Sequence, residues 1–104
     1  MYRAAFKMRL KSGFEKEYKR RHDEIWPELV RLLEEAGVRD YSIFLDEETG
    51  DLYAVQKLTQ ENTAGSLGQT DLMQRWWDYM ADIMEVNPDN SPVQRPLREV
   101  FHMD

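Results

Sequence analysis

Residues 17–37 of this chain read EYKRRHDEIWPELVRLLEEAG, and this stretch decides how the N-terminal third folds. Aromatic and apolar side chains recur in it every three or four positions, the period of a helix with one buried face; they are Tyr18, His22, Ile25, Leu29, Leu32 and Ala36. Pro27 interrupts this pattern, because proline lacks an N–H and its ring clashes with the preceding turn. Proline is accepted in a first helical turn, so we expect two helical segments that meet between Asp23 and Trp26. Gly37 supplies the stop.

Strand patterns lie on both sides of this helical stretch. Residues 2–11 alternate apolar with mostly basic side chains, which indicates a strand with one buried face. Residues 41–45 and 52–58 are expected to pair as a hairpin around the turn DEETGD, residues 46–51. LREVFHM, residues 97–103, is expected to be the last strand.

A second main helix is expected over residues 71–85, DLMQRWWDYMADIME, with Thr70 as its N-cap. The segment before it, TQENTAGSLGQ at residues 59–69, could begin with Thr59 as a cap. Its glycines, Gly65 and Gly68, favour a short or irregular helix there. The proline-rich segment VNPDNSPVQRP that follows the second helix is expected to be an ordered loop.

The expected order is therefore strand, helix, strand, strand, helix, strand, within a single domain spanning residues 1–104. This order predicts a ferredoxin-like α+β fold, in which an antiparallel sheet is covered by helices on one face. The other face of the sheet also needs cover. Two copies that press these open faces together would form a dimeric α+β barrel, so we expect a homodimer.

The composition excludes several classes of partner. A net charge of −6 without a basic stripe repels nucleic acid and anionic membranes. The absence of cysteine rules out disulfides and thiolate metal sites, and it is compatible with a reducing compartment. There is no His-x-x-x-His pair, no phosphate-binding glycine loop, and no apolar run long enough for a signal peptide or a membrane span. We expect a cytoplasmic protein that binds a small molecule and no metal.

His22 is the candidate for proton transfer, because histidine is the one side chain whose ordinary pKa lies near neutrality. The chain has only two histidines, and the other, His102, lies near the C-terminus, where a solvated or packing role is the default. Tyr18 precedes His22 by four residues, so on a helix the two side chains share a face and could reach one ligand. The alternative is an edge-of-core aromatic residue beside a cation at a helix C-terminus.

Trp76 and Trp77 are the candidates for a flat binding wall. Neighbours on a helix point about 100° apart, so both cannot face the core squarely, and one is expected at a pocket rim. An indole ring suits the C–H face and the hydroxyl groups of a sugar, although two core tryptophans remain the alternative. Tyr41, at the start of an expected strand, adds a hydroxyl group with the same two interpretations.

Five separated segments, in this order, resemble the L-rhamnose mutarotase family: EYKRRHDEIWPEL, YSIFLD, RWWDYM, NPDNSP and EVFHM. The resemblance spans nearly the whole chain, and it implies a dimeric α+β barrel that interconverts the α and β anomers of L-rhamnose without a cofactor. It also implies His22 as the catalytic residue and Tyr18, Tyr41, Trp76 and Trp77 as the sugar contacts. Residues 59–69 depart from the family pattern, in which a more helix-forming segment carries an aromatic residue, but they include none of these five positions.

Mutarotation needs a proton taken from the anomeric hydroxyl and one given to the ring oxygen. Our hypothesis is that His22 is the main proton donor, that Tyr18 orients the sugar or the proton path, and that the general base is not yet assigned. Two other functions stay open on the sequence alone. One is a small oxygenase of the same barrel type, acting on a polycyclic aromatic or haem, and the other is a sugar-binding or regulatory dimer. Selectivity between L-rhamnose and related deoxysugars such as L-fucose also stays open.

Overall fold

The strands and helices follow one another in the predicted order. The computed structural model describes residues 1–104, with strands β1 (Tyr2–Arg9), β2 (Val38–Leu45), β3 (Asp51–Leu58) and β4 (Arg95–Leu97). Its α-helices are α1 (Glu15–Asp23), α2 (Pro27–Glu35) and α3 (Asp71–Met80), and two short 3-10 helices are η1 (Ala64–Gln69) and η2 (Ala81–Ile83).

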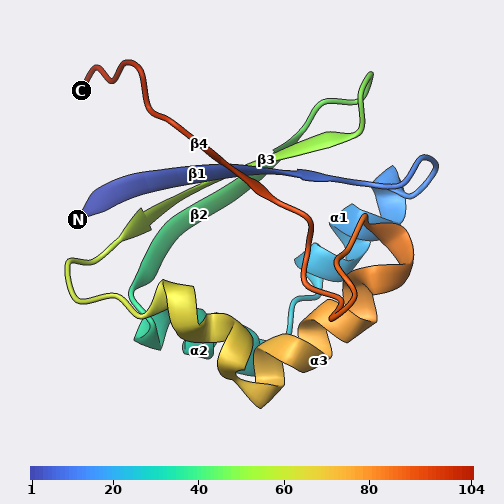
Figure 1. Cartoon of the computed structure of the whole chain (residues 1–104), viewed down its shortest axis with the longest axis horizontal. Coiled ribbons are helices and arrows are strands. Elements are labelled where there is room, and N and C mark those ends of the chain that lie inside the picture. Colours follow the sequence, from blue (N-terminus) through green and yellow to red (C-terminus); the bar gives the residue numbers. More distant parts are fainter.

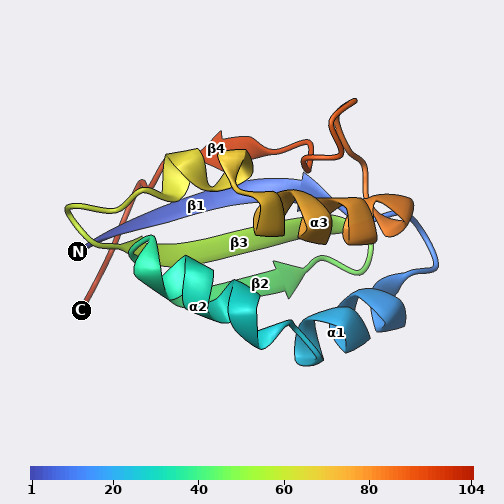
Figure 2. The ribbon, with the colours of Figure 1, turned by 90° about the horizontal axis from the view of Figure 1, so that it is seen from below.

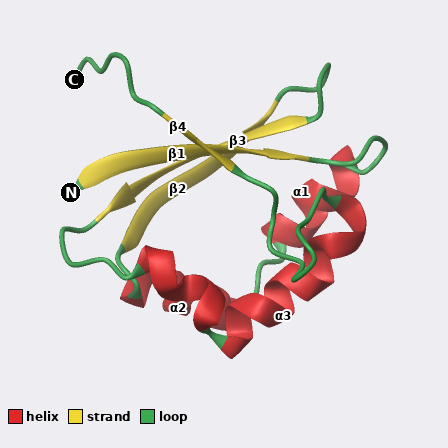
Figure 3. Ribbon diagram, viewed as in Figure 1, coloured by secondary structure: helices red, strands yellow, loops and turns green.

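The four strands form one antiparallel sheet in the order β2-β3-β1-β4. All three α-helices lie below this sheet in Figure 1, and Figure 3 shows the same separation of strands and helices by colour. Seen from the helical side in Figure 2, α1 and α2 run along one edge and α3 lies beside them across the sheet. The predicted α+β fold, with an antiparallel sheet covered on one face, is therefore confirmed.

The predicted division of the first helical stretch at Pro27 is also confirmed. The first helix ends at Asp23 and the second begins at Pro27. Trp26, the residue between them that precedes the proline, has φ −62° and ψ 128°, an extended conformation. The proline ring disfavours the helical region for the residue before it, so the break has a local steric cause.

Gly37 ends α2 for two reasons. Its φ is +92°, in the left-handed region that favours glycine, as the predicted stop requires. A Cβ at this position would also lie 2.8 Å from the Cβ of Asn62, so the chain passes too close for a side chain. The Gly37 carbonyl accepts a hydrogen bond from the Thr59 N–H at 2.9 Å, which joins the end of α2 to the end of β3.

The hydrophobic core lies between the sheet and the helices. Strand side chains that point toward the helices are largely buried, and α2, α3 and η2 close the core from the other side. Its principal members are Met8, Leu10, Leu29, Leu52, Met73, Met80 and Ile83.

The opposite face of the sheet has no helix over it (Figure 1). The strand register places apolar side chains together on this face, beside Ser42, Lys7 and Arg95 in the same two cross-strand rows; the apolar ones are Ala5, Phe44, Tyr53, Val55 and Leu97. Phe44 is 63% exposed. We call this surface the open sheet face.

Several boundaries differ from those expected, including the end of β1 at Arg9 and the start of β2 at Val38. The second main helix ends at Met80, and residues 81–83 continue as a tighter 3-10 turn. The segment 59–69 contains the expected short helix, but Thr63 precedes it and the expected Thr59 cap is wrong. Thr70 does cap α3, with its hydroxyl accepting a hydrogen bond from the Met73 N–H at 3.3 Å.

The expected last strand at residues 97–103 is wrong in all but its first residue. The last strand is β4, Arg95–Leu97, and residues 98–104 are exposed. A strand needs a neighbour that completes its backbone hydrogen bonds, and only Arg95, Pro96 and Leu97 pair with β1. The apolar alternation that suggested a strand therefore finds no partner within this chain.

Candidate active site

A cavity of about 1210 Å³ lies between the sheet and the helices. Its wall includes all five residues that the sequence singled out: Tyr18, His22, Tyr41, Trp76 and Trp77. These residues come from α1, β2 and α3, so the fold brings together positions far apart in the chain. A concave, mostly apolar cavity with a few polar groups is the usual form of a small-molecule site.

His22 has a defined tautomer and orientation. Its Nδ1 lies 3.1 Å from the Tyr18 carbonyl oxygen. Because a carbonyl only accepts hydrogen bonds, Nδ1 carries the proton and donates, which leaves the lone pair of Nε2 free. The imidazole also stacks on the Tyr18 ring, with centroids 4.3 Å apart, and meets the Trp76 ring edge-on at 5.4 Å.

Burial lowers the pKa of His22 below its ordinary 6.5, because a charged imidazolium loses its hydration there. The hydrogen bond to the Tyr18 carbonyl and the nearby Asp23 carboxylate oppose this shift in the pKa but do not cancel it. At neutral pH, His22 is therefore a neutral imidazole whose Nε2 can accept a proton.

The two tyrosines of the cavity stay protonated. Burial raises the pKa of the Tyr18 hydroxyl, and a charged Tyr41 nearby would raise it further. Burial also raises the pKa of Tyr41 to about 12. Tyr41 is 39% exposed as a whole residue, but its hydroxyl end is surrounded by protein, which is why burial raises the pKa of that group. Each phenol can therefore donate a hydrogen bond to a sugar hydroxyl.

A β-bulge in β2 sets the direction of Tyr41. Arg39 pairs with Lys57 and Ser42 pairs with Val55, so Asp40 and Tyr41 together oppose a single residue of β3. Asp40 adopts φ +47°, which few residues other than glycine, asparagine and aspartate tolerate. The extra residue shifts the alternation of the strand, so that Tyr41 faces the cavity. This bulge was not predicted from the sequence.

Trp76 and Trp77 have different surroundings, as predicted. Trp76 is buried and packs edge-on against Trp26, with ring centroids 5.0 Å apart. Trp77 is half-buried and lies against the backbone of Gly68, where an added Cβ would come within 2.6 Å of the indole Cη2. Gly68 therefore leaves room for the Trp77 ring, a packing function that its neighbours in the sequence do not predict.

Two further aromatic residues belong to this cluster and were not predicted. Trp26 stacks on Tyr79 with ring centroids 5.7 Å apart, and both rings contact Trp76. They support Trp76 from behind. The Trp-Pro pair at the start of α2 was the available sequence signal for Trp26.

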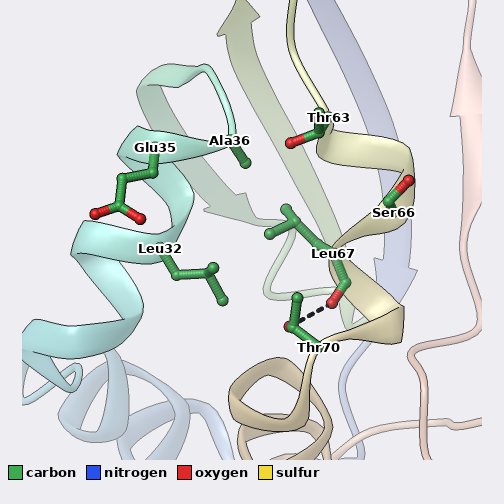
Figure 4. Close-up of a pocket in the computed structure, with 7 residues that line it drawn as sticks. All are labelled: Leu32, Glu35, Ala36, Thr63, Ser66, Leu67 and Thr70. Carbon is green, nitrogen blue, oxygen red and sulfur yellow. Dashed lines mark hydrogen bonds between the residues drawn. The ribbon is translucent and has the colours of Figure 1, made fainter.

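A second hollow of about 240 Å³ lies between α2 and η1, away from this cluster (Figure 4). It contains none of the five candidate residues, and the Thr70 hydroxyl at its edge already donates to the Leu67 carbonyl at 2.6 Å. The larger cavity is thus the better candidate. No three histidine, aspartate or glutamate side chains gather closely enough to hold a metal ion. No helix is long and apolar enough to cross a membrane.

Comparisons with known proteins give consistent matches over nearly the whole chain. A family model described as L-rhamnose mutarotase matches residues 3–103. An L-rhamnose mutarotase of Bacteroides thetaiotaomicron is 62% identical over 104 residues, which cover the whole of both chains. One from Sinorhizobium fredii is 56% identical over 103 residues, 99% of each chain. A crystal structure of L-rhamnose mutarotase from Formosa agariphila covers 100% of both chains with a TM-score of 0.93 and 54% identity.

Proposed function

This chain belongs to the L-rhamnose mutarotase family, and from that premise we propose that it interconverts the α and β anomers of L-rhamnose. The observation that carries the proposal is the cavity itself. Full-length relatives carry this activity in their names, and the cavity holds one neutral histidine among aromatic and phenolic side chains. Such a set suits a neutral sugar whose reaction consists of proton transfers.

We assign the proton transfers to His22. The anomeric hydroxyl gives its proton to the free Nε2 lone pair, the C1–O5 bond breaks as the C1=O1 bond forms, and the ring oxygen takes a proton from the imidazolium. After rotation about C1–C2 the steps reverse, so no proton is gained or lost. One nitrogen can serve both oxygens, because both are bonded to C1. The lowered pKa supports the second step, since it makes the imidazolium a stronger acid. This chemistry requires no cofactor.

The other four residues bind and orient the sugar in this proposal. Tyr18 stacks on the imidazole and offers a phenol beside it, so it is placed to hold a hydroxyl near the anomeric carbon. Tyr41 offers a second phenol from the sheet side. Trp76 forms the supported back wall and Trp77 the rim, where an indole can lie against the C–H face of the ring.

The test is saturation-transfer NMR between the two anomeric protons of L-rhamnose, compared with spontaneous exchange. The protein should accelerate exchange, and His22→Gln should lower that acceleration by about 10²- to 10⁴-fold, the usual contribution of general acid–base catalysis. His102→Gln is the matched control, because His102 is exposed and hydrogen-bonds only to Asp104. A folded His22→Gln protein with full activity would refute the assignment.

The alternatives give different results in the same experiment. Sugar binding without faster exchange would indicate a sugar-binding or regulatory protein. Oxygen consumption with a bound coloured ligand, and no effect on rhamnose, would indicate an oxygenase.

We also propose that the active form is a cytoplasmic homodimer, joined through the open sheet face. The exposed Phe44 and the apolar side chains around it support this, because contiguous apolar surface is usually covered by a partner. Light scattering tests the dimer, and cell fractionation tests the location.

A further inference from the structure

Arg21 is an unusual residue, since it is a charged side chain that is only 9% exposed. Its guanidinium donates to four oxygens on three residues. Nε donates to Glu17 at 2.7 Å, Nη1 to the Tyr79 carbonyl at 2.7 Å and to the Asp82 carboxylate at 2.8 Å, and Nη2 to the second Asp82 oxygen at 3.2 Å. The guanidinium also lies 4.6 Å from the centre of the Tyr79 ring.

These contacts join α1 to the end of α3. Glu17 is in α1, whereas Tyr79 is in the last turn of α3 and Asp82 is in η2. Every other side-chain hydrogen bond of α1 stays within residues 13–24. The hydrogen bonds of Arg21 therefore connect α1 to Tyr79 and Asp82, and Arg20 of α1 also interacts with the Tyr79 side chain.

The hydrogen bonds of Arg21 lie directly beside the residues to which the proton transfers are assigned. His22 is the next residue in α1, and Trp76 is one helical turn before Tyr79 in α3. The edge of the Trp76 ring meets the His22 imidazole with an angle of 87° between the ring planes. The relative position of α1 and α3 therefore determines how the His22 imidazole lies against Trp76.

We propose that Arg21 is a positioning residue, which fixes α1 against α3 and so holds the His22 imidazole in its reactive orientation. This inference rests on the proposed function, in which His22 transfers the protons. Arg21 acts through geometry, because its charge is balanced by the Glu17 and Asp82 carboxylates. Its hydrogen bonds lower the pKa of both carboxyl groups, that of Glu17 to about 2 together with Arg20, so both partners stay ionised at neutral pH.

The experiment compares Arg21→Lys and Arg21→Met with Arg20→Met. Arg20 is the matched control, since it is the adjacent arginine of the same helix, pairs with Glu17 and Glu24 at the surface and interacts with the Tyr79 side chain, but does not reach Asp82 or the Tyr79 carbonyl. Lysine keeps the charge of Arg21, but it cannot reproduce the planar fork that reaches Asp82 and the Tyr79 carbonyl together. It should therefore fail to restore activity.

Two readouts separate positioning from a general loss of structure. The first is kinetic: kcat for anomer exchange should fall at least tenfold in both Arg21 variants with KM nearly unchanged, because proton transfer is more sensitive to a small displacement than binding is. The second needs no sugar. The ring currents of Tyr18 and Trp76 shift the NMR resonances of the His22 imidazole, and these shifts should shrink in the Arg21 variants and persist in Arg20→Met.

Folded Arg21 variants with parental kcat and parental His22 shifts would overturn the proposal. If Arg21→Met does not fold, Asp82→Asn serves instead, because it weakens the bidentate pair and leaves the bonds to Tyr79 and Glu17 in place. Its kcat and His22 shifts should change in the same direction by a smaller amount, and parental values for both would again overturn the proposal. An inactive wild-type protein would refute the proposed function alone, since the His22 shifts still report whether Arg21 positions the imidazole.

Discussion

Replacing Phe44 by glutamate should separate the proposed homodimer into single chains. Phe44 lies on the open sheet face, opposite Tyr53 in the β2–β3 ladder. In an isolated chain it is 63% exposed. If two copies cover this face, each loses an apolar contact and gains a carboxylate that must leave water.

The size of the effect follows from the exposed area. A phenylalanine buries about 150–250 Å², so an exposure of 63% leaves roughly 95–160 Å² for a partner to cover. At about 25 cal/mol per Å², this area contributes roughly 2–4 kcal/mol to association. A two-fold axis places the substitution in the interface twice, which raises the loss to about 5–8 kcal/mol. Each 1.4 kcal/mol changes Kd about tenfold, so the Kd of the dimer should rise by at least roughly 10³-fold.

The assay is sedimentation velocity over a wide range of protein concentration, with circular dichroism to verify folding. Phe14→Glu is the control, because Phe14 is also an exposed phenylalanine but lies at the N-cap of α1 and not in the sheet. The parent and Phe14→Glu should sediment as dimers and Phe44→Glu as a monomer. A Phe44→Glu protein that stays dimeric at low concentration would refute a dimer built on this face, and a monomeric parent would refute the dimer altogether.

Four further predictions concern His22, Trp77 and the β2 bulge. Because the pKa of folded His22 lies below 6.5, kcat/KM should fall on the acid side with a midpoint below 6.5; a midpoint above 6.5 would contradict a buried neutral base. The same lowered pKa should reduce the free energy of unfolding as pH falls from 6.5 through the folded pKa, because the unfolded chain binds the proton first. In denaturant titrations, His22→Gln should remove that part of the pH dependence. Gly68→Val should push Trp77 back by about 1 Å or more and lower kcat/KM at least tenfold. Gly65→Val is the control and should leave kcat/KM unchanged, because a Cβ at residue 65 meets nothing within 4 Å. Equal kinetics for both variants would show that the position of Trp77 is unimportant. Asp40→Val should destabilise the protein in thermal unfolding by about 1–2 kcal/mol relative to Asp40→Gly, since the left-handed conformation costs a β-branched residue that much, and equal melting temperatures would contradict a strained bulge.

The parts of the fold that were predictable are those with local causes. Pro27 determines its own helix boundary through its ring, and Gly37 determines the stop through its φ. The last strand was not predictable in the same way. Residues 97–103 have a strand-like alternation, but whether they become a strand depends on the hydrogen bonds made with a distant neighbour, and the pairing with β1 ends at Leu97.

The candidate site also contains some features with local causes and others with long-range causes. Tyr18 and His22 could be paired from their spacing, because one helical turn places them on one face. The rim position of Trp77 followed from its adjacency to Trp76. The supports could not be found this way, because Gly68 and Arg21 act on residues that are remote in sequence and close only after folding.

The sheet order has a consequence for how the chain folds. The first strand made, β1, lies between β3 and β4, and its nearest ladder partner along the chain, Asp51, comes 42 positions after Arg9. The β2–β3 hairpin can close locally, but β1 must wait for it, and such long-range pairing makes folding slow. Meanwhile both edges of β1 are open to other nascent chains. The chain is therefore most exposed to aggregation in the interval before β3 and β4 pair with β1.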